Sequence, residues 1–222
     1  ISKGIDNNKD QSYVLWGLSQ QSLSRSKFPL GGYTKTEIRQ MALDNGLTEL
    51  AAKSESYEIC FVPDNDYRGF LKRRVTDLEE KVAGGNFIDK TGRILGKHEG
   101  YPFYTVGQRK GLGIALGEPA FVTHIDPKNN TVTLGTVEDL EKTEMMVRNP
   151  NMIKYASVND NFEALTKVRY KDKGAMSSIS LTGDGRVKVV FHSRVTGIAP
   201  GQSAVFYEGD DVVGGGFICR ED

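Results

Sequence analysis

The sequence predicts an α+β protein of several domains, because its pattern changes twice along the chain. Helical spacing dominates the first part, a middle part combines one helix with two hairpin patterns, and the last part contains only short strand patterns. We therefore expect the helical tail of an α/β domain over residues 1–62, a small mixed central domain over 63–146, and a C-terminal antiparallel β-barrel over 147–222.

Two helices are expected in the first part. Thr34 and Glu37 form a Ser/Thr-x-x-Glu capping box, apolar residues follow at helical spacing, and Gly46 provides a stop. Asp10 is a candidate N-cap for an earlier helix. The apolar, β-favouring run 57–62 then stops at Pro63 and predicts a short strand.

The middle part opens with a helical pattern over 64–74. Hairpin patterns follow at 87–95 and 120–134, separated by the glycine-rich stretch 107–113, which we expect to be a loop. After a joint at 148–150 come five short strand patterns, which are 164–170, 177–181, 187–191, 203–207 and 212–218. Several short strands joined by turns are typical of a small antiparallel barrel.

Composition restricts the function. The 29 basic residues balance the 29 acidic ones, so any RNA contact must use local patches. No apolar run is long enough to span a bilayer, and two cysteines far apart fit a reducing cytosol, so we expect a cytoplasmic protein without a membrane partner. The chain begins at Ile1, without an initiator Met or a signal peptide pattern, which suggests a piece excised from a longer protein.

Cys60 is the first candidate for chemistry. It lies near the end of the predicted strand 57–62, and Arg68, Lys72, Arg73 and Arg74 follow within 14 residues. Basic groups near an accessible thiol lower its pKa and favour the reactive thiolate. The alternative is that Cys60, between two large apolar residues, is a small buried hydrophobe.

Two other segments are candidates for binding. In 107–113 the glycines allow a close backbone approach to a phosphate or another chain, and Arg109 and Lys110 add donors; a tight solvated turn is the alternative. The basic run 167–173 contains one aromatic residue, Tyr170, that could stack on a base, although a strand with exposed charges would look similar. The three histidines lack metal-ligand spacing, so we predict no metal site.

A series of motifs resembles one known family. In chain order these are Lys9-Asp10-Gln11-Ser12-Tyr13, Phe28-Pro29-Leu30-Gly31, the predicted helix before Gly46, Ser56 to Phe61, Tyr104 to Ile114, Val168-Arg169-Tyr170, and Pro200 to Tyr207. The series resembles the bacterial and mitochondrial tRNA-specific 2-thiouridylases, and the ordered match runs to the end of the chain.

The resemblance implies an enzyme that thiolates the wobble uridine of tRNA. In that family an N-terminal domain with a Ser-Gly-Gly-x-Asp-Ser loop uses ATP, with Mg²⁺ expected, to adenylate the uridine at its 2-oxygen. This chain does not contain that loop, so we expect it to be inactive alone. A cysteine matching Cys60 receives a persulfide sulfur from a carrier or desulfurase protein. A second cysteine, outside this chain, helps to release that sulfur by forming a disulfide with the first cysteine.

The resemblance also implies tRNA contacts at six residues, which are Lys9, Asp10, Gln11, Arg169, Tyr170 and Gln202. Cys219 matches no family cysteine and is interpreted as structural. An extra residue or so between Gly46 and Cys60 blurs the match only there. Two rival interpretations remain: a non-catalytic RNA-binding module with Cys60 in its core, and an adaptor that docks a sulfur carrier.

Overall fold

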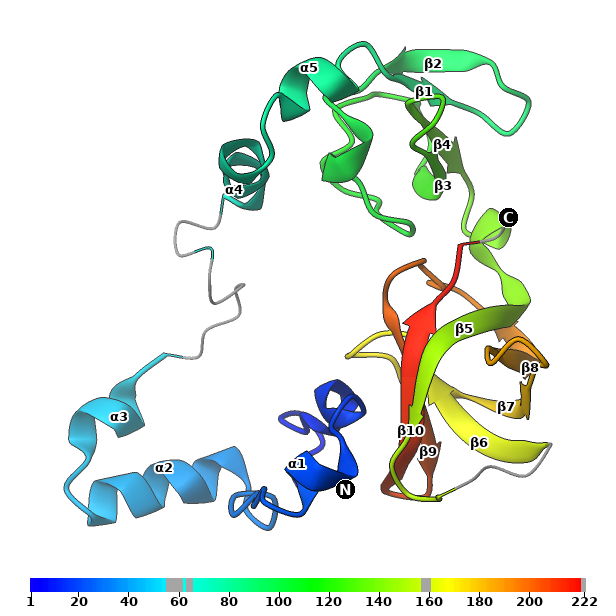
Figure 1. Cartoon of the computed structure of the whole chain (residues 1–222). Helices are drawn as coiled ribbons and strands as arrows, with labels where there is room; N and C mark the ends of the chain where they lie inside the picture. Colours follow the sequence, from blue (N-terminus) through cyan, green and yellow to red (C-terminus); the bar gives the residue numbers. More distant parts are fainter. Residues whose placement is uncertain (55–61, 63–65, 157–160, 221–222) are drawn as a thin grey trace. The chain divides into compact units, whose positions relative to one another are not determined.

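The structure is a computed structural model that describes residues 1–54, 62, 66–156 and 161–220. It divides into two compact units. The first combines Ile1–Lys53 with Lys142–Asp222, and the second is Ser54–Glu141 (Figure 1). The predicted division into three domains at about 62 and 146 stays a prediction.

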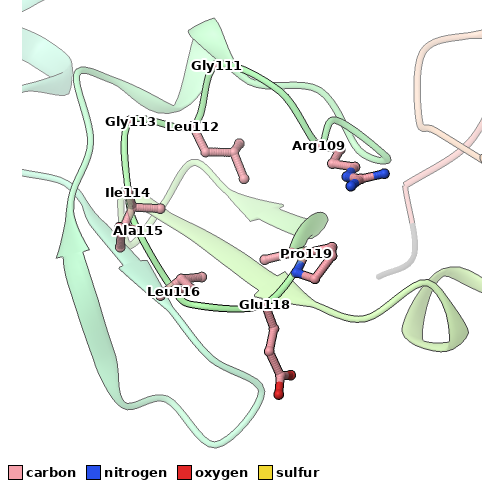
Figure 2. Close-up of a pocket in the computed structure, with 10 residues that line it drawn as sticks. Arg109, Gly111, Leu112, Gly113, Ile114, Ala115, Leu116, Glu118 and Pro119 are labelled. Carbon is pink, nitrogen blue, oxygen red and sulfur yellow. The ribbon is translucent and has the colours of Figure 1, made fainter.

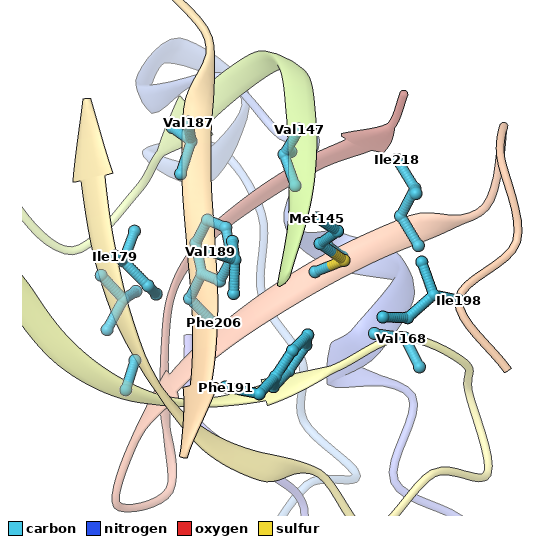
Figure 3. Close-up of a cluster of buried hydrophobic side chains, with 13 residues drawn as sticks. Met145, Val147, Val168, Ile179, Val187, Val189, Phe191, Ile198, Phe206 and Ile218 are labelled. Carbon is cyan, nitrogen blue, oxygen red and sulfur yellow. The ribbon is translucent and has the colours of Figure 1, made fainter. Parts of the chain in front are cut away.

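A closed antiparallel barrel forms the larger part of the first unit. Its strands are β5 (Lys142–Met152), β6 (Phe162–Lys167), β7 (Ala175–Leu181), β8 (Val187–Val195), β9 (Ser203–Glu208) and β10 (Asp211–Ile218). They pair in the order β10-β5-β8-β7-β6-β9, and β9 and β10 close the ring. Alternate residues point inward, so side chains such as Val147, Val189 and Phe206 fill the interior (Figure 3).

The barrel confirms the predicted fold class and adds one strand to the five patterns. β5 was not predicted, because Asn149-Pro150 is typical of a turn. In the structure these two residues lie within the strand. Asn149 has a φ of 51°, and the pairing register with β10 shifts between Gly215 and Phe217, which is the signature of a bulge. β5 begins at Lys142, before the start predicted for the barrel domain at 147.

The N-terminal segment of the first unit contains η1 (Ser12–Leu15), α1 (Gln20–Leu23), α2 (Lys35–Asp44) and α3 (Thr48–Ala52). The capping box predicted at Thr34 and Glu37 is present in both directions. The helix predicted after Asp10 is wrong, since only a 3₁₀ turn forms there. The Asp10 carboxylate accepts from the N–H of Ser12, which favours a local turn over a helix.

The turn around η1 is fastened to the barrel. Trp16 is buried and lies edge-on to Phe217, with ring centroids 5.2 Å apart. A Cβ on Gly215 would lie 2.8 Å from Trp16 and 2.6 Å from the carbonyl oxygen of Ala204. The missing side chain at Gly215 therefore makes the notch into which Trp16 fits. Asn151 supports this contact by donating to the carbonyls of Trp16 and Leu18.

The second unit is a small mixed sheet with helices. Its elements are α4 (Tyr67–Arg74), α5 (Leu78–Val82), β1 (Asn86–Ile88), β2 (Ile94–Lys97), η2 (Tyr101–Phe103), β3 (Phe121–Asp126), β4 (Thr131–Gly135) and η3 (Glu138–Leu140). The sheet order is β2-β1-β4-β3, and β1 pairs in parallel with β4. Both predicted hairpins are confirmed. The strand predicted at 57–62 lies outside the described residues except for Val62, and so does the start of the helix predicted at 64–74.

None of the helices in the described ranges is long and apolar enough to cross a membrane.

Candidate nucleic-acid interface

The turn that carries Lys9, Asp10 and Gln11 is shaped by the middle residue. The Asp10 carboxylate accepts from the backbone N–H of Gly4 at 3.1 Å and of Ser12 at 3.0 Å, and from the Ser12 hydroxyl at 2.8 Å. Lys9 and Gln11 on either side are exposed. Asp10 therefore acts first as the residue that holds this turn, and it leaves its two neighbours at the surface.

Tyr13 joins this turn to the segment that carries Gln202. Its hydroxyl donates to the carbonyl of Ser203 at 2.7 Å, directly after Gln202. Gln202 itself is exposed at the end of a turn in which Gly201 has a φ of 85°, and its N–H donates to the carbonyl of Ala199 at 3.1 Å. The two predicted contact segments, which this hydrogen bond joins across 190 positions of the chain, thus share one buried phenol.

Tyr13 also contacts the third predicted segment. The ring of Tyr170 lies edge-on to it, with centroids 6.2 Å apart, and 40% of Tyr170 remains exposed. The Arg169 Nε donates to the carbonyl of Gly197 at 3.0 Å. The prediction that 164–170 is one strand is wrong at its end, because β6 stops at Lys167 and these two residues lie in the turn that follows.

Asp172 organises that turn. One carboxylate oxygen accepts from the N–H of Val168 at 3.0 Å and the other from the N–H of Gly174 at 3.1 Å. The acid in the middle of a basic run is therefore used inside the turn, while Lys171 and Lys173 beside it are exposed. The sequence signal for this role was an aspartate between two lysines before a glycine, which our prediction did not use.

Two ammonium groups lie over the ring of a buried phenol, and one of them, that of Lys3, also forms an ion pair with Asp210 at 3.4 Å. The ammonium groups of Lys3 and Lys167 lie 5.0 and 5.4 Å from the ring centroid of Tyr207. Burial raises the pKa of Tyr207 to about 12, and burial first, then the neighbouring Tyr207, raises the pKa of Tyr13. Both phenols are protonated at neutral pH; that of Tyr13 donates to the carbonyl of Ser203, and the hydroxyls of Tyr207 and Ser12 share one hydrogen bond. Lys3 and Tyr13 were not among the predicted site residues.

Two further sequence candidates belong to other segments of the chain. Cys60 lies outside the described residues. The loop predicted at 107–113 is confirmed as a loop and belongs to the second unit. Cys219 is free and half-buried, with its N–H donating to the carbonyl of Met146 at 2.8 Å. Within the described ranges, no group of three His, Cys, Asp or Glu side chains could hold a metal ion.

Comparison with known families gives the class of the chain. Residues 1–64 match the tRNA methyl transferase HUP domain, residues 68–136 its PRC-barrel domain, and residues 142–218 the aminomethyltransferase β-barrel domain. Together the three models cover most of the sequence. The chain is therefore a multidomain protein in which these three domains follow one another.

Curated relatives narrow this to one family. The chain is 60% identical over 219 residues to the tRNA-specific 2-thiouridylase of Cytophaga hutchinsonii, covering 98% of this chain and 59% of that protein. It is 58% identical to that of Amoebophilus asiaticus, over 98% and 58%, and 50% identical to that of Salinibacter ruber, over 98% and 57%. The chain belongs to the tRNA-specific 2-thiouridylase family and spans about three fifths of the length of these relatives.

Proposed function

We propose that this chain belongs to an enzyme that replaces the 2-oxygen of the wobble uridine of tRNA with sulfur, and that it supplies the sulfur-bearing cysteine and a tRNA-binding surface. The main support is the convergence at Tyr13 of the three segments that contain Lys9, Gln11, Arg169, Tyr170 and Gln202. Exposed basic side chains beside an exposed aromatic ring suit an RNA phosphate and an unstacked base.

Cys60 is proposed as the carrier of the sulfur. The terminal sulfur of its persulfide attacks C2 of the uridine, and AMP leaves with the original 2-oxygen. The thiolate of a second cysteine, outside this chain, then attacks the sulfur of Cys60. The sulfur–sulfur bond of the persulfide breaks, a disulfide forms, and the terminal sulfur remains on C2. A persulfide is more acidic than a thiol and is ionised at neutral pH.

The described residues do not fit ATP. The sequence lacks the Ser-Gly-Gly-x-Asp-Ser loop, and carboxylates already occupy the start of α2, where a helix otherwise attracts phosphate. The Glu37 carboxylate accepts from the N–H of Thr34, and the Asp6 carboxylate accepts from the N–H of Lys35. We therefore assign ATP and Mg²⁺ to residues beyond this chain.

The partners follow from the same chemistry. A persulfide on Cys60 needs a donor whose sulfur is already at the oxidation level of a persulfide, so we propose a sulfur carrier or a cysteine desulfurase as the second partner beside tRNA. Two cysteines far apart in the sequence, too few for a secreted disulfide scaffold, support the proposal of a cytoplasmic enzyme.

The test uses the full-length protein with a cysteine desulfurase, cysteine, ATP and tRNA. Mass spectrometry should find one added sulfur on Cys60, and the Cys60→Ser variant should form no 2-thiouridine. Cys219→Ser is the matched control and should keep the activity. Thiolation by the Cys60→Ser variant would instead support the rival, in which Cys60 is a core residue of an RNA-binding module; Cys60 should then alkylate no faster in the native protein than in a denatured control.

The tRNA surface has its own test. Arg169→Ala and Tyr170→Ala should each weaken tRNA binding by about tenfold, in line with the loss of a phosphate contact or of one stacked base. Arg186→Ala is the control, since Arg186 lies in a separate turn beside Asp184. If Arg169→Ala and Tyr170→Ala bind tRNA as tightly as the Arg186→Ala control does, the proposed surface is contradicted.

A further inference from the structure

The second unit contains an Ω-loop that the proposed mechanism does not use. Residues 108–121 leave and return at one place, where the N–H of Gly107 donates to the carbonyl of Val122 at 2.7 Å and the N–H of Val122 donates to the carbonyl of Gln108 at 2.9 Å. The loop surrounds a pocket of about 490 Å³ (Figure 2). Because it is closed at its base, the loop is a defined structure rather than a loose connection.

Backbone donors around this pocket have no partner within the described chain. From Gly111 to Glu118 no backbone N–H donates a hydrogen bond in the described structure. The loop is held by its side chains, since Leu112 is buried in the core of the unit and Ile114 and Leu116 pack against it. Anchoring through side chains leaves the N–H groups available, and such groups in a curved segment make a site for anions.

Glycines keep the space in front of these donors open. Gly111, Gly113 and Gly117 have φ values of 72°, 71° and 76°, which other residues adopt only with strain. A Cβ on Gly113 or on Gly117 would meet nothing within 4 Å. A ligand can therefore approach the backbone itself.

Charge favours an anion at the pocket. Arg109 lines it, with its guanidinium 6.0 Å from the ring centroid of Phe121, and the exposed Lys110 follows. Gln108 fixes this pair, because its side chain accepts from the N–H of Thr105 at 3.1 Å and donates to the carbonyl of Lys110 at 2.9 Å. Glu118 also lines the pocket, but Figure 2 shows its side chain pointing away from the space that the loop surrounds.

We propose that the Ω-loop binds a phosphate of the tRNA backbone, as a contact separate from the surface around Tyr13. A phosphate can accept hydrogen bonds from backbone N–H groups together with a guanidinium. An extended peptide would instead require a straight edge with alternating donors and acceptors, which a curved loop with glycines at positive φ does not offer. The inference rests on the proposed function, because it takes tRNA as the ligand.

The first experiment measures tRNA binding by the 222-residue chain at several salt concentrations. Relative to wild type, an Arg109→Gln, Lys110→Gln double variant should bind about tenfold more weakly, with a salt slope lower by about one to two. Lys128→Gln, on an exposed turn of the same unit, is the control and should leave both values unchanged. An unchanged slope in the double variant overturns the proposal, and circular dichroism confirms that each variant is folded.

The second experiment follows hydrogen exchange in the peptides that cover 109–118 and 168–174 on addition of tRNA. Protection of both peptides is the expected result. Protection of 168–174 alone overturns the Ω-loop contact and leaves the proposed function standing. Protection of neither peptide contradicts both. Protection of 109–118 by a sulfur-carrier protein but not by tRNA also overturns the proposal, in favour of a protein-docking loop.

Discussion

The two units differ in how they satisfy their polar groups. In the barrel unit the buried hydroxyls are paired: Ser12 lies 3.1 Å from the hydroxyl of Tyr207, and Thr166 lies 2.7 Å from that of Ser177. In the central unit, three buried side-chain atoms have no partner within the described chain. These are Oδ1 of Asn86, Nε2 of His98 and Oδ1 of Asn130.

The difference shows which unit satisfies its buried polar groups through its own hydrogen bonds. A buried polar group without a partner costs free energy, so such groups are rare in a finished core. The barrel and the turns on it are closed by their own hydrogen bonds and can present a fixed surface. The central unit carries unused donors and acceptors, both at His98 and along the Ω-loop, and is therefore the part whose stability and dynamics should respond most to solution conditions or to a ligand.

The largest expected effect is on the stability of the barrel unit. Gly215→Ala would place a methyl group against Trp16 and the carbonyl of Ala204, and we expect a loss of about 3 kcal/mol in the free energy of unfolding of the barrel unit. Thermal and denaturant unfolding measure it. Gly183→Ala, where a Cβ meets nothing within 4 Å, is the control; equal stability of the two variants would contradict the Trp16 notch.

Asp172→Ala tests how the basic turn is held. Its loss leaves the N–H groups of Val168 and Gly174 without their acceptor, which should cost about 2 kcal/mol and speed hydrogen exchange at both. Asp172→Asn keeps one carbonyl oxygen and should fall between wild type and Asp172→Ala. If exchange in this turn does not change, the turn is held by other contacts.

The central unit should respond to pH through His98. Burial lowers the pKa of His98 below its usual value, and the charge of Lys97 adds to this shift. Because the folded-state pKa is the lower one, protons favour the unfolded state; the stability is complete above about pH 6.5 and falls as the pH drops, by less than about 1.4 kcal/mol per pH unit.

Hydrogen exchange distinguishes the two units in this test. Amides of Phe87 and Val132, in the central core, should exchange faster from a more open state at pH 5 than at pH 7 after correction for intrinsic rates, and those of Val189 and Phe206 in the barrel should respond less. His98→Gln should remove the difference. An equal response in both cores would mean that His98 is not its source.

The smallest effect concerns the link between the contact segments. Tyr13→Phe keeps the ring beside Tyr170 but removes the hydrogen bond to Ser203, with an expected cost of about 1 kcal/mol. The same variant should weaken tRNA binding less than Tyr170→Ala does. A larger loss of binding from Tyr13→Phe would mean that the Tyr13 hydroxyl contacts the RNA directly.

Local signals in the sequence predicted what depends on neighbours in the chain. The capping box at Thr34, both hairpins and five of the barrel strands follow from residues a few positions apart. β5 was not predicted, because the bulge at Asn149 is stabilised by pairing with β10 rather than by its own sequence. The site residues came from the resemblance, and their convergence on Tyr13 could not be predicted, since it depends on contacts between segments more than 150 positions apart.

The notch at Gly215 also provides a spectroscopic probe. Trp16 is the single tryptophan of the sequence, and it is buried where the N-terminal segment meets the barrel. Its emission wavelength and quenching by iodide therefore report the attachment of that segment without any label. A red shift that precedes the loss of β-structure on heating would reveal that the segment detaches while the barrel is still folded.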